Sequence, residues 1–242
     1  MRHADETREK SRNTRRRLIL ILSLSAVFIM VSIYCLQYYM TSTERIVLKH
    51  LSEKYDGQEF IPLGISNTGY FGRGEDVLHC YPKGGDPKTD DVDAGMLKTE
   101  DGEVEFNDNY FGILIREDVE AEVLDTLSDM NLPMKAYYRE FGSFDEIFDG
   151  TKTYADLKKA IIAGEENHRF DIDIYLLCEN IENREQYAEQ IFDKLSEDGL
   201  RRLVDVYVTA DTNLYNRVTR RNQDEIFIPD DETVFSFYKI IG

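Results

Sequence analysis

The segments RFDIDIYLLC (residues 169–178) and LVDVYVTA (residues 203–210) decide the fold, because both have the apolar alternation that is typical of a β-strand. Between them lies REQYAEQIFDKLSE (residues 184–197), a pattern typical of a helix, which ends before Gly199. A strand, a helix and a second strand in this order favour a sheet with helices packed on it.

The other predicted elements extend this pattern in both directions. Apolar spacing and turn residues predict helices at residues 44–55, 109–130, 154–163 and 213–220, and strands at residues 59–65, 76–81, 102–106, 134–141 and 233–241. Residues 82–95 are rich in Pro, Gly and Asp and are typical of a loop. We therefore expect an α+β fold of mixed sheet with packed helices, in two half-domains at residues 44–132 and 133–242.

A long apolar segment precedes this domain. Residues 18–40 contain no charged side chain and follow directly on three arginines at residues 15–17. Hydrocarbon about 30 Å thick is crossed by a helix of roughly 20 apolar residues, so the segment predicts one transmembrane helix that acts as a signal-anchor. A cleaved secretory signal is the alternative, but its apolar part is usually about 7 to 15 residues long and ends at a small-x-small site. The sequence shows no such site here.

The charges on either side of this segment predict its orientation. Residues 1–17 carry seven Lys or Arg and three acidic residues, whereas the first basic residue after the segment is Arg45. The positive-inside rule places such a basic tail in the cytoplasm. We therefore expect a single-pass protein of the cell membrane that contacts lipid through residues 18–40 and has its C-terminal domain outside.

The composition limits the partners and the chemistry of the core. The chain has a formal net charge of −18, which repels the phosphates of nucleic acid and attracts cations and basic peptides. It contains no Trp but 15 Tyr and 13 Phe, so the core depends on phenyl and phenol rings. Cys80 and Cys178 each end a strand-like stretch and could either form a disulfide or remain as buried thiols.

Three short motifs carry a resemblance. At YDGQEF (residues 55–60), YPKGGD (residues 81–86) and DNYF (residues 108–111), the chain resembles uncharacterised membrane-anchored or lipid-anchored proteins of Gram-positive bacteria. Those proteins follow an N-terminal anchor with a helix, Glu-Lys-Tyr-Gly, a strand, Tyr-Pro-Lys and Asp-Asn-Tyr. The resemblance covers about residues 44–130, and it implies a location and an α+β shape but no activity.

The loop at residues 82–95 contains the candidate metal ligands Asp86, Asp90, Asp91 and Asp93. Hard cations bind several carboxylate oxygens on a flexible backbone, so calcium is the cofactor that this loop suggests. The spacing differs from that of an EF-hand, because Gly102 stands where the bidentate Glu is required. A solvated loop without a metal is the alternative, and no other cofactor is indicated.

The sequence offers few catalytic groups. It contains neither Gly-x-Ser-x-Gly nor His-Glu-x-x-His. His79 and Cys80 are adjacent on a predicted strand and should point to opposite faces, so they cannot share one ion. Asp171 and Asp173 alternate with isoleucines and should project from one side of a strand, either as an acid and base pair or as part of a wet sheet face. Five basic residues stand out in the acidic domain, and they either pair with neighbouring acids or dock an anionic partner: Arg201, Arg202, Arg217, Arg220 and Arg221.

These features favour a non-catalytic domain that binds a protein, a peptide or a component of the cell envelope. One alternative is a cell-envelope hydrolase that uses the paired carboxylates Asp171 and Asp173. A second alternative is a calcium-dependent structural module built on the loop at residues 86–93. No residue is assigned a catalytic role.

Overall fold

The structure is a computed structural model of the 242-residue chain. It describes residues 21–25, 27–34, 42–66, 76–99, 101–139, 142, 144, 147–223 and 234–242. The chain divides into two units, Met1–Ile46 and Val47–Gly242. Each unit is described by itself.

In the first unit, residues 21–25 and 27–34 are helical and exposed. The prediction of a transmembrane helix at residues 18–40 is wrong, because among the described residues no helix has the length and apolar character that a membrane crossing requires. The single-pass topology, the membrane contact and the location that were predicted from this helix are corrected with it. Residues 1–20, 26 and 35–41 lie outside the described residues.

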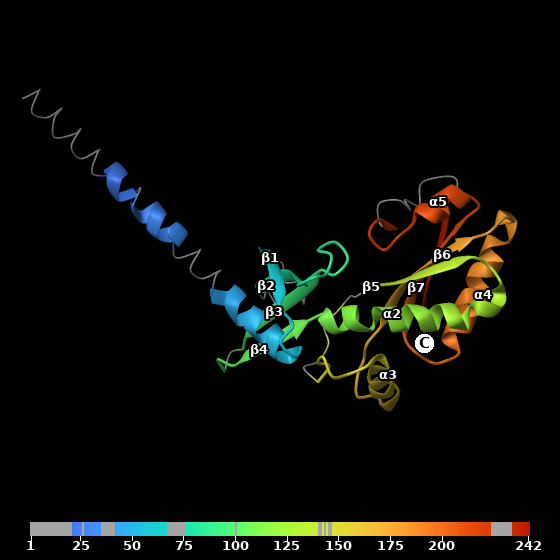
Figure 1. The fold of residues 1–242 in the computed structure, drawn as a ribbon, viewed down its shortest axis with the longest axis horizontal. Coiled ribbons are helices and arrows are strands. Elements are labelled where there is room, and N and C mark those ends of the chain that lie inside the picture. The colour runs from blue at the N-terminus through green and yellow to red at the C-terminus, as the bar shows by residue number, and fades with distance from the viewer. Residues whose placement is uncertain are drawn as a thin grey trace, which may run out of the picture. The chain divides into compact units, whose positions relative to one another are not determined.

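The second unit begins with an antiparallel sheet of four strands in the order β1-β2-β3-β4 (Figure 1). The strands are β1 (Phe60–Ser66), β2 (Asp76–Pro82), β3 (Val92–Lys98) and β4 (Val104–Asp108). Three of them lie close to the predicted positions, but β3 falls largely in the segment that was predicted to be a loop. A helix observed at residues 42–54 supplies Val47 and Leu51 to the core on one face of this sheet.

The second sheet has the strand order β5-β6-β7-β8, and it is mixed, because β6 and β7 pair in parallel while the outer pairs are antiparallel. Its strands are β5 (Met134–Arg139), β6 (Phe170–Leu177), β7 (Arg202–Thr209) and β8 (Val234–Ile241). Besides the helix at residues 42–54, this α+β fold contains α2 (Tyr110–Thr126), α3 (Tyr154–Ala163), α4 (Arg184–Ser196) and α5 (Thr212–Arg217), with short 3-10 turns η1 (Ser128–Met130) and η2 (Ile181–Asn183).

The largest core lies on one face of the second sheet. Alternate residues of the two central strands are fully buried there, namely Ile172, Ile174, Leu176, Val204, Val206 and Val208. Helices α2 and α4 supply the facing apolar side chains, and Figure 1 shows both helices beside this sheet. On the opposite face, Leu214 and Tyr215 of α5 pack against Tyr175 in a smaller cluster. The sheet is therefore covered on both faces, which explains the nearly continuous burial of β6.

Asp108 joins three elements at the junction between the sheets. Its carboxylate accepts hydrogen bonds from Lys54 Nζ at 2.8 Å, from Tyr55 Oη at 2.6 Å and from the backbone N–H of Tyr110 at 3.0 Å. Asp108 is 1% exposed and the Lys54 side chain 6% exposed, so this ion pair is withdrawn from water. Burial, together with the charge of Asp108, raises the pKa of Tyr55 far above its usual value, so this phenol remains a hydrogen-bond donor.

We predict that Asp108→Asn lowers the free energy of unfolding by about 3 to 5 kcal/mol, because it leaves the buried Lys54 ammonium without its counter-charge. The double variant Asp108→Asn/Lys54→Met should be more stable than Asp108→Asn alone, since it removes the charge that was left behind. Urea unfolding of the full chain measures both, with the exposed Asp101→Asn as the control. Equal stability of Asp108→Asn and Asp101→Asn would contradict the assignment.

His168 lies in an aromatic part of the main core. It is 6% exposed, its ring stacks on Phe144 with centroids 4.5 Å apart, and its Nε2 atom is 3.0 Å from Tyr138 Oη. Burial lowers the pKa of His168 from 6.5 to about 4, so the imidazole is neutral in the folded chain at pH 7.

We expect this histidine to destabilise the fold in acid. The unfolded chain takes up its proton near pH 6.5 and the folded chain only near pH 4. The contribution of His168 to the free energy of unfolding is therefore complete above pH 6.5 and falls by up to about 3 kcal/mol as the pH is lowered towards 4. His168→Gln should show a weaker loss of stability between pH 7.5 and pH 5 than the parent chain or Asn167→Gln in urea titrations. Parallel pH profiles for all three proteins would refute it.

Candidate functional site

One group of potential metal ligands lies on the first sheet. His79 of β2, Asp93 of β3 and Asp91, which directly precedes β3, each place one ligand atom within 4.8 Å of the others. The strand register explains this, because His79 pairs directly with Asp93 and a residue two positions from Asp93 projects from the same face. We call these three residues the His79 cluster.

The cluster lies on the sheet face opposite the apolar core. Cys80, the neighbour of His79, is fully buried among core residues, as strand alternation predicts. Burial raises the pKa of the Cys80 thiol, and this cysteine and Cys178 are both free, so they do not form a disulfide. The His79 side chain is 33% exposed and remains accessible to solvent.

Hydrogen bonds fix the orientation of the His79 ring. Its Nδ1 atom is 2.5 Å from Oδ1 of Asp93, and its Nε2 atom is 2.7 Å from Oγ of Ser66. The backbone N–H of Asp93 donates to Oδ1 of Asn109 at 2.9 Å, which ties this part of β3 to the start of α2. Three neighbouring strands therefore hold the imidazole in one plane.

The electrostatics of the cluster favour a cation. Partial burial raises the pKa of Asp91, and the nearby charge of Asp93 raises it further, while His79 acts in the opposite direction. A positive charge between the two carboxylates would offset the effect of Asp93 on Asp91. An imidazole nitrogen and carboxylate oxygens are also the donors that zinc and related ions use in proteins.

The structure separates the four predicted metal ligands into two groups. Asp91 and Asp93 belong to the His79 cluster, but Asp86 and Asp90 have other partners. Asp90 accepts a hydrogen bond from Arg116 Nη2 at 2.6 Å and another from the backbone N–H of Asp86 at 2.8 Å. Although burial acts to raise it, the pKa of Asp90 is lowered by these two hydrogen bonds.

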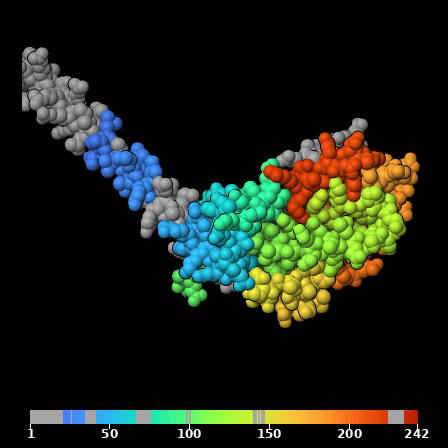
Figure 2. Space-filling view, viewed as in Figure 1, coloured from blue at the N-terminus to red at the C-terminus, as the bar shows by residue number. Residues whose placement is uncertain are grey.

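Asp86 connects the same loop to the segment that follows α5. Its Oδ2 atom is 3.1 Å from Nη1 of Arg221, which follows α5. Figure 2 shows the two segments in contact, the teal one containing Asp86 and the red one containing Arg221. The acidic residues of the loop at residues 83–91 therefore serve partly to bind arginines of the same chain. The cluster of aspartates in the sequence could not distinguish that role from ion binding.

The paired carboxylates of β6 are buried and bound to arginines. Asp171 accepts two hydrogen bonds from Arg169, at 2.7 and 3.0 Å. Asp173 lies opposite Asp205 of β7, and Nη2 of Arg139 is 3.1 Å from Asp173 and 2.5 Å from Asp205. Both β6 carboxylates face the same side, as predicted. The two residues are buried there rather than exposed to solvent. Arg139 thus links β5 to the acids of β6 and β7, whereas Arg169 pairs with Asp171 within one chain segment.

The basic residues identified in the sequence pair largely within the domain. Arg202 donates to both carboxylate oxygens of Asp198 at 2.6 Å. Arg220 pairs with Glu120 of α2 and donates to the backbone carbonyl of Tyr138. Internal pairing therefore accounts for these two arginines.

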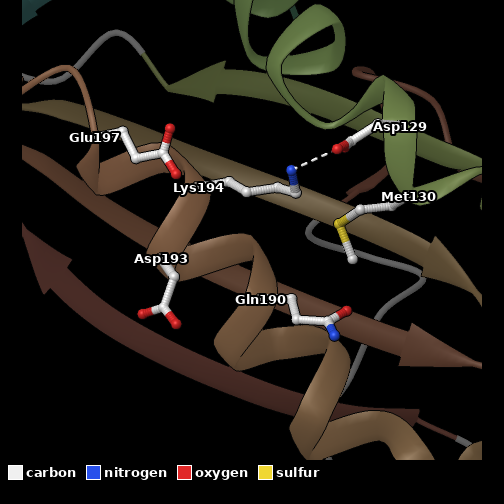
Figure 3. Close-up of a pocket in the computed structure, with 6 residues that line it drawn as sticks. All are labelled: Asp129, Met130, Gln190, Asp193, Lys194 and Glu197. Carbon is white, nitrogen blue, oxygen red and sulfur yellow. Dashed lines mark hydrogen bonds and ion pairs between the residues drawn. The ribbon is translucent and has the colours of Figure 1, made fainter.

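An open pocket of about 420 Å³ lies between η1 and α4 (Figure 3). Its lining residues are mostly charged: Asp129, Met130, Gln190, Asp193, Lys194 and Glu197. Figure 3 shows the Lys194 side chain reaching across to Asp129, and the two charged groups are 2.7 Å apart. The pocket contains three carboxylates and one ammonium, so it favours positively charged groups, but it lacks the imidazole that distinguishes the His79 cluster.

Comparison with known proteins adds little to this description. No protein-family model and no curated protein matches the chain. Among solved structures, the chain is similar to a DUF5037 family protein from Ruminococcus gnavus ATCC 29149, with 18% sequence identity and a TM-score of 0.40. The match covers 80% of this chain and 89% of that chain. The likeness transfers no function.

Proposed function

We propose that this chain is a non-catalytic binding domain whose first sheet holds one divalent cation at His79, Asp91 and Asp93. The observation that carries the proposal is the convergence of one imidazole and two carboxylates within 4.8 Å on an accessible sheet face. His79 and Asp93 belong to adjacent, hydrogen-bonded strands, and Asp91 directly precedes one of them, so the first two ligands are largely fixed before a cation binds. A preformed site loses little conformational freedom on binding.

The charge of the chain indicates what else the domain binds. A net charge of −18 attracts basic polypeptide segments and slows the approach of nucleic acid or anionic surfaces. The acidic pocket between η1 and α4 provides one local surface of this sign. A positively charged protein or peptide is therefore the partner that we propose.

The alternative of a hydrolase with paired carboxylates gains no support from the geometry. A general acid and base must have different pKa values and must reach a substrate. Asp171 is 4% exposed and Asp173 is 1% exposed, and arginines hold both side chains. Neither carboxylate is therefore placed to meet a substrate.

Thermal unfolding tests the cation site. The full chain is treated with a chelator, dialysed, and unfolded with and without added Ca²⁺, Mn²⁺ or Zn²⁺. A cation that binds only the folded chain should raise Tm by about 5 to 10 °C at a concentration of 100 Kd.

Asp91→Asn should abolish this rise, because it removes one ligand from an exposed position without disturbing the core. Asp118→Asn changes the same charge on the exposed side of α2 and serves as the matched control. A rise of equal size in both variants would place the cation elsewhere and would end the proposal.

A further inference from the structure

We infer that the His79 cluster takes a transition-metal ion such as Zn²⁺ rather than Ca²⁺, and that Ser66 is the positioning residue that directs Nδ1 of His79 to the metal. This inference rests on the proposed cation-binding function and specifies its ligand. It assigns a role to a serine that no sequence motif identified.

The donor set distinguishes between the two classes of ion. Calcium takes six to eight oxygen ligands at about 2.3 to 2.6 Å, usually from a flexible loop. The cluster offers one nitrogen and at most four carboxylate oxygens, and His79 and Asp93 belong to paired strands. Zinc sites with an open position use three protein ligands drawn from His, Cys, Asp and Glu. The cluster matches this second pattern in number and in chemistry.

The contacts of His79 determine which ring nitrogen faces the ion. Ser66 Oγ is 2.7 Å from Nε2, whereas Nδ1 faces Oδ1 of Asp93 at 2.5 Å. Nε2 is therefore used by the serine, and Nδ1 is the nitrogen on the carboxylate side. A histidine that binds metal usually donates its other N–H to a fixed acceptor, which sets the tautomer and the ring orientation. The Ser66 hydroxyl can be that acceptor.

The position of Ser66 follows from the sheet register. Ser66 ends β1 and pairs with Val77, which lies two residues before His79 on β2. Residues two apart on a strand project from the same face, so the serine and the imidazole are diagonal neighbours. Strands β1, β2 and β3 therefore supply the positioning hydroxyl, the imidazole and one carboxylate in turn across the sheet.

Metal binding requires only a small rearrangement. Two ligands of a tetrahedral zinc ion, each about 2.0 to 2.1 Å from the metal, are about 3.3 Å apart. Nδ1 of His79 and Oδ1 of Asp93 are 2.5 Å apart in the structure, the distance of a short hydrogen bond. The ion would take the place of the proton between these atoms. In a neutral ring that one proton would move through solvent from Nδ1 to Nε2, and the Nε2–H group so formed would donate to Ser66.

Calorimetric titration of the chelator-treated full chain with ZnCl₂ and with CaCl₂ tests the inference. We expect one Zn²⁺ per chain, bound at least 100-fold more tightly than Ca²⁺. His79→Asn should reduce the Zn²⁺ affinity to the level of Ca²⁺, because it replaces the nitrogen ligand with an amide. If neither ion binds and Mn²⁺ also leaves Tm unchanged, the proposed function fails as well. If Ca²⁺ binds as tightly as Zn²⁺, or if His79→Asn retains the Zn²⁺ affinity, the inference is wrong and the cation-binding proposal stands.

The role of Ser66 is tested separately in the same titration. Ser66→Ala should weaken Zn²⁺ binding roughly 10- to 100-fold, the usual cost of losing a partner of a metal-bound histidine. Ser66→Thr keeps the hydroxyl and should restore binding, which a purely steric role of the serine would not produce. Ser128→Ala, an exposed serine in η1, is the control and should leave the affinity unchanged. Equal Zn²⁺ affinity of Ser66→Ala and the parent chain would remove the positioning role.

Discussion

The carboxylate of Asp108 is surrounded by an ammonium, a phenol and a backbone amide, and the two sheets meet where these four groups are joined. Each group alone would be costly to bury, because water solvates an isolated charge or dipole much better than a protein interior does. Together they satisfy one another. The main chain of Asp108 also accepts a hydrogen bond from Phe144, so the residue connects β4 to the segment that leads into the second core. The entry of α2 is thereby fixed, and α2 contributes buried residues to both cores.

The distribution of arginines shows how an acidic chain tolerates close packing of its strands. With 47 acidic and 29 basic residues, repulsion between carboxylates opposes the folded state. The structure places Arg139 between Asp173 and Asp205, where two acids approach each other. It places Arg116 beside Asp90. The planar guanidinium with several donors suits such positions better than a lysine does. At the His79 cluster no arginine occupies the corresponding position among the contacts described, and an imidazole faces the carboxylates instead.

The sequence predicted the regular elements better than their partners. Helix α2 was clear because its apolar residues recur at helical spacing and Asn131 and Pro133 follow it. Strand β3 was missed, since Asp93 and Gly95 disfavour a strand by propensity and only pairing on both sides with β2 and β4 makes one. The apolar segment at residues 18–40 was misread as a transmembrane helix from hydropathy alone, whereas no helix among the described residues has the length and apolar character that a crossing requires. Half of the predicted metal ligands belong to the His79 cluster, but His79 could be grouped with them only through the register of β2 and β3.

The two sheets also differ in how far apart along the chain their paired strands are. In β1-β2-β3-β4 every strand pairs with its neighbours in sequence, so each contact closes only a short segment. Strands β6 and β7 are parallel, so the chain between them, which contains α4, must cross over the sheet before they can pair. Parallel pairing of this kind is intrinsically slow. The nascent polypeptide would therefore form the sheet β1-β2-β3-β4 early. The apolar residues of β6 and β7 would stay exposed longest, until helices pack on them. That interval, rather than the finished fold, is when this chain is most exposed to self-association.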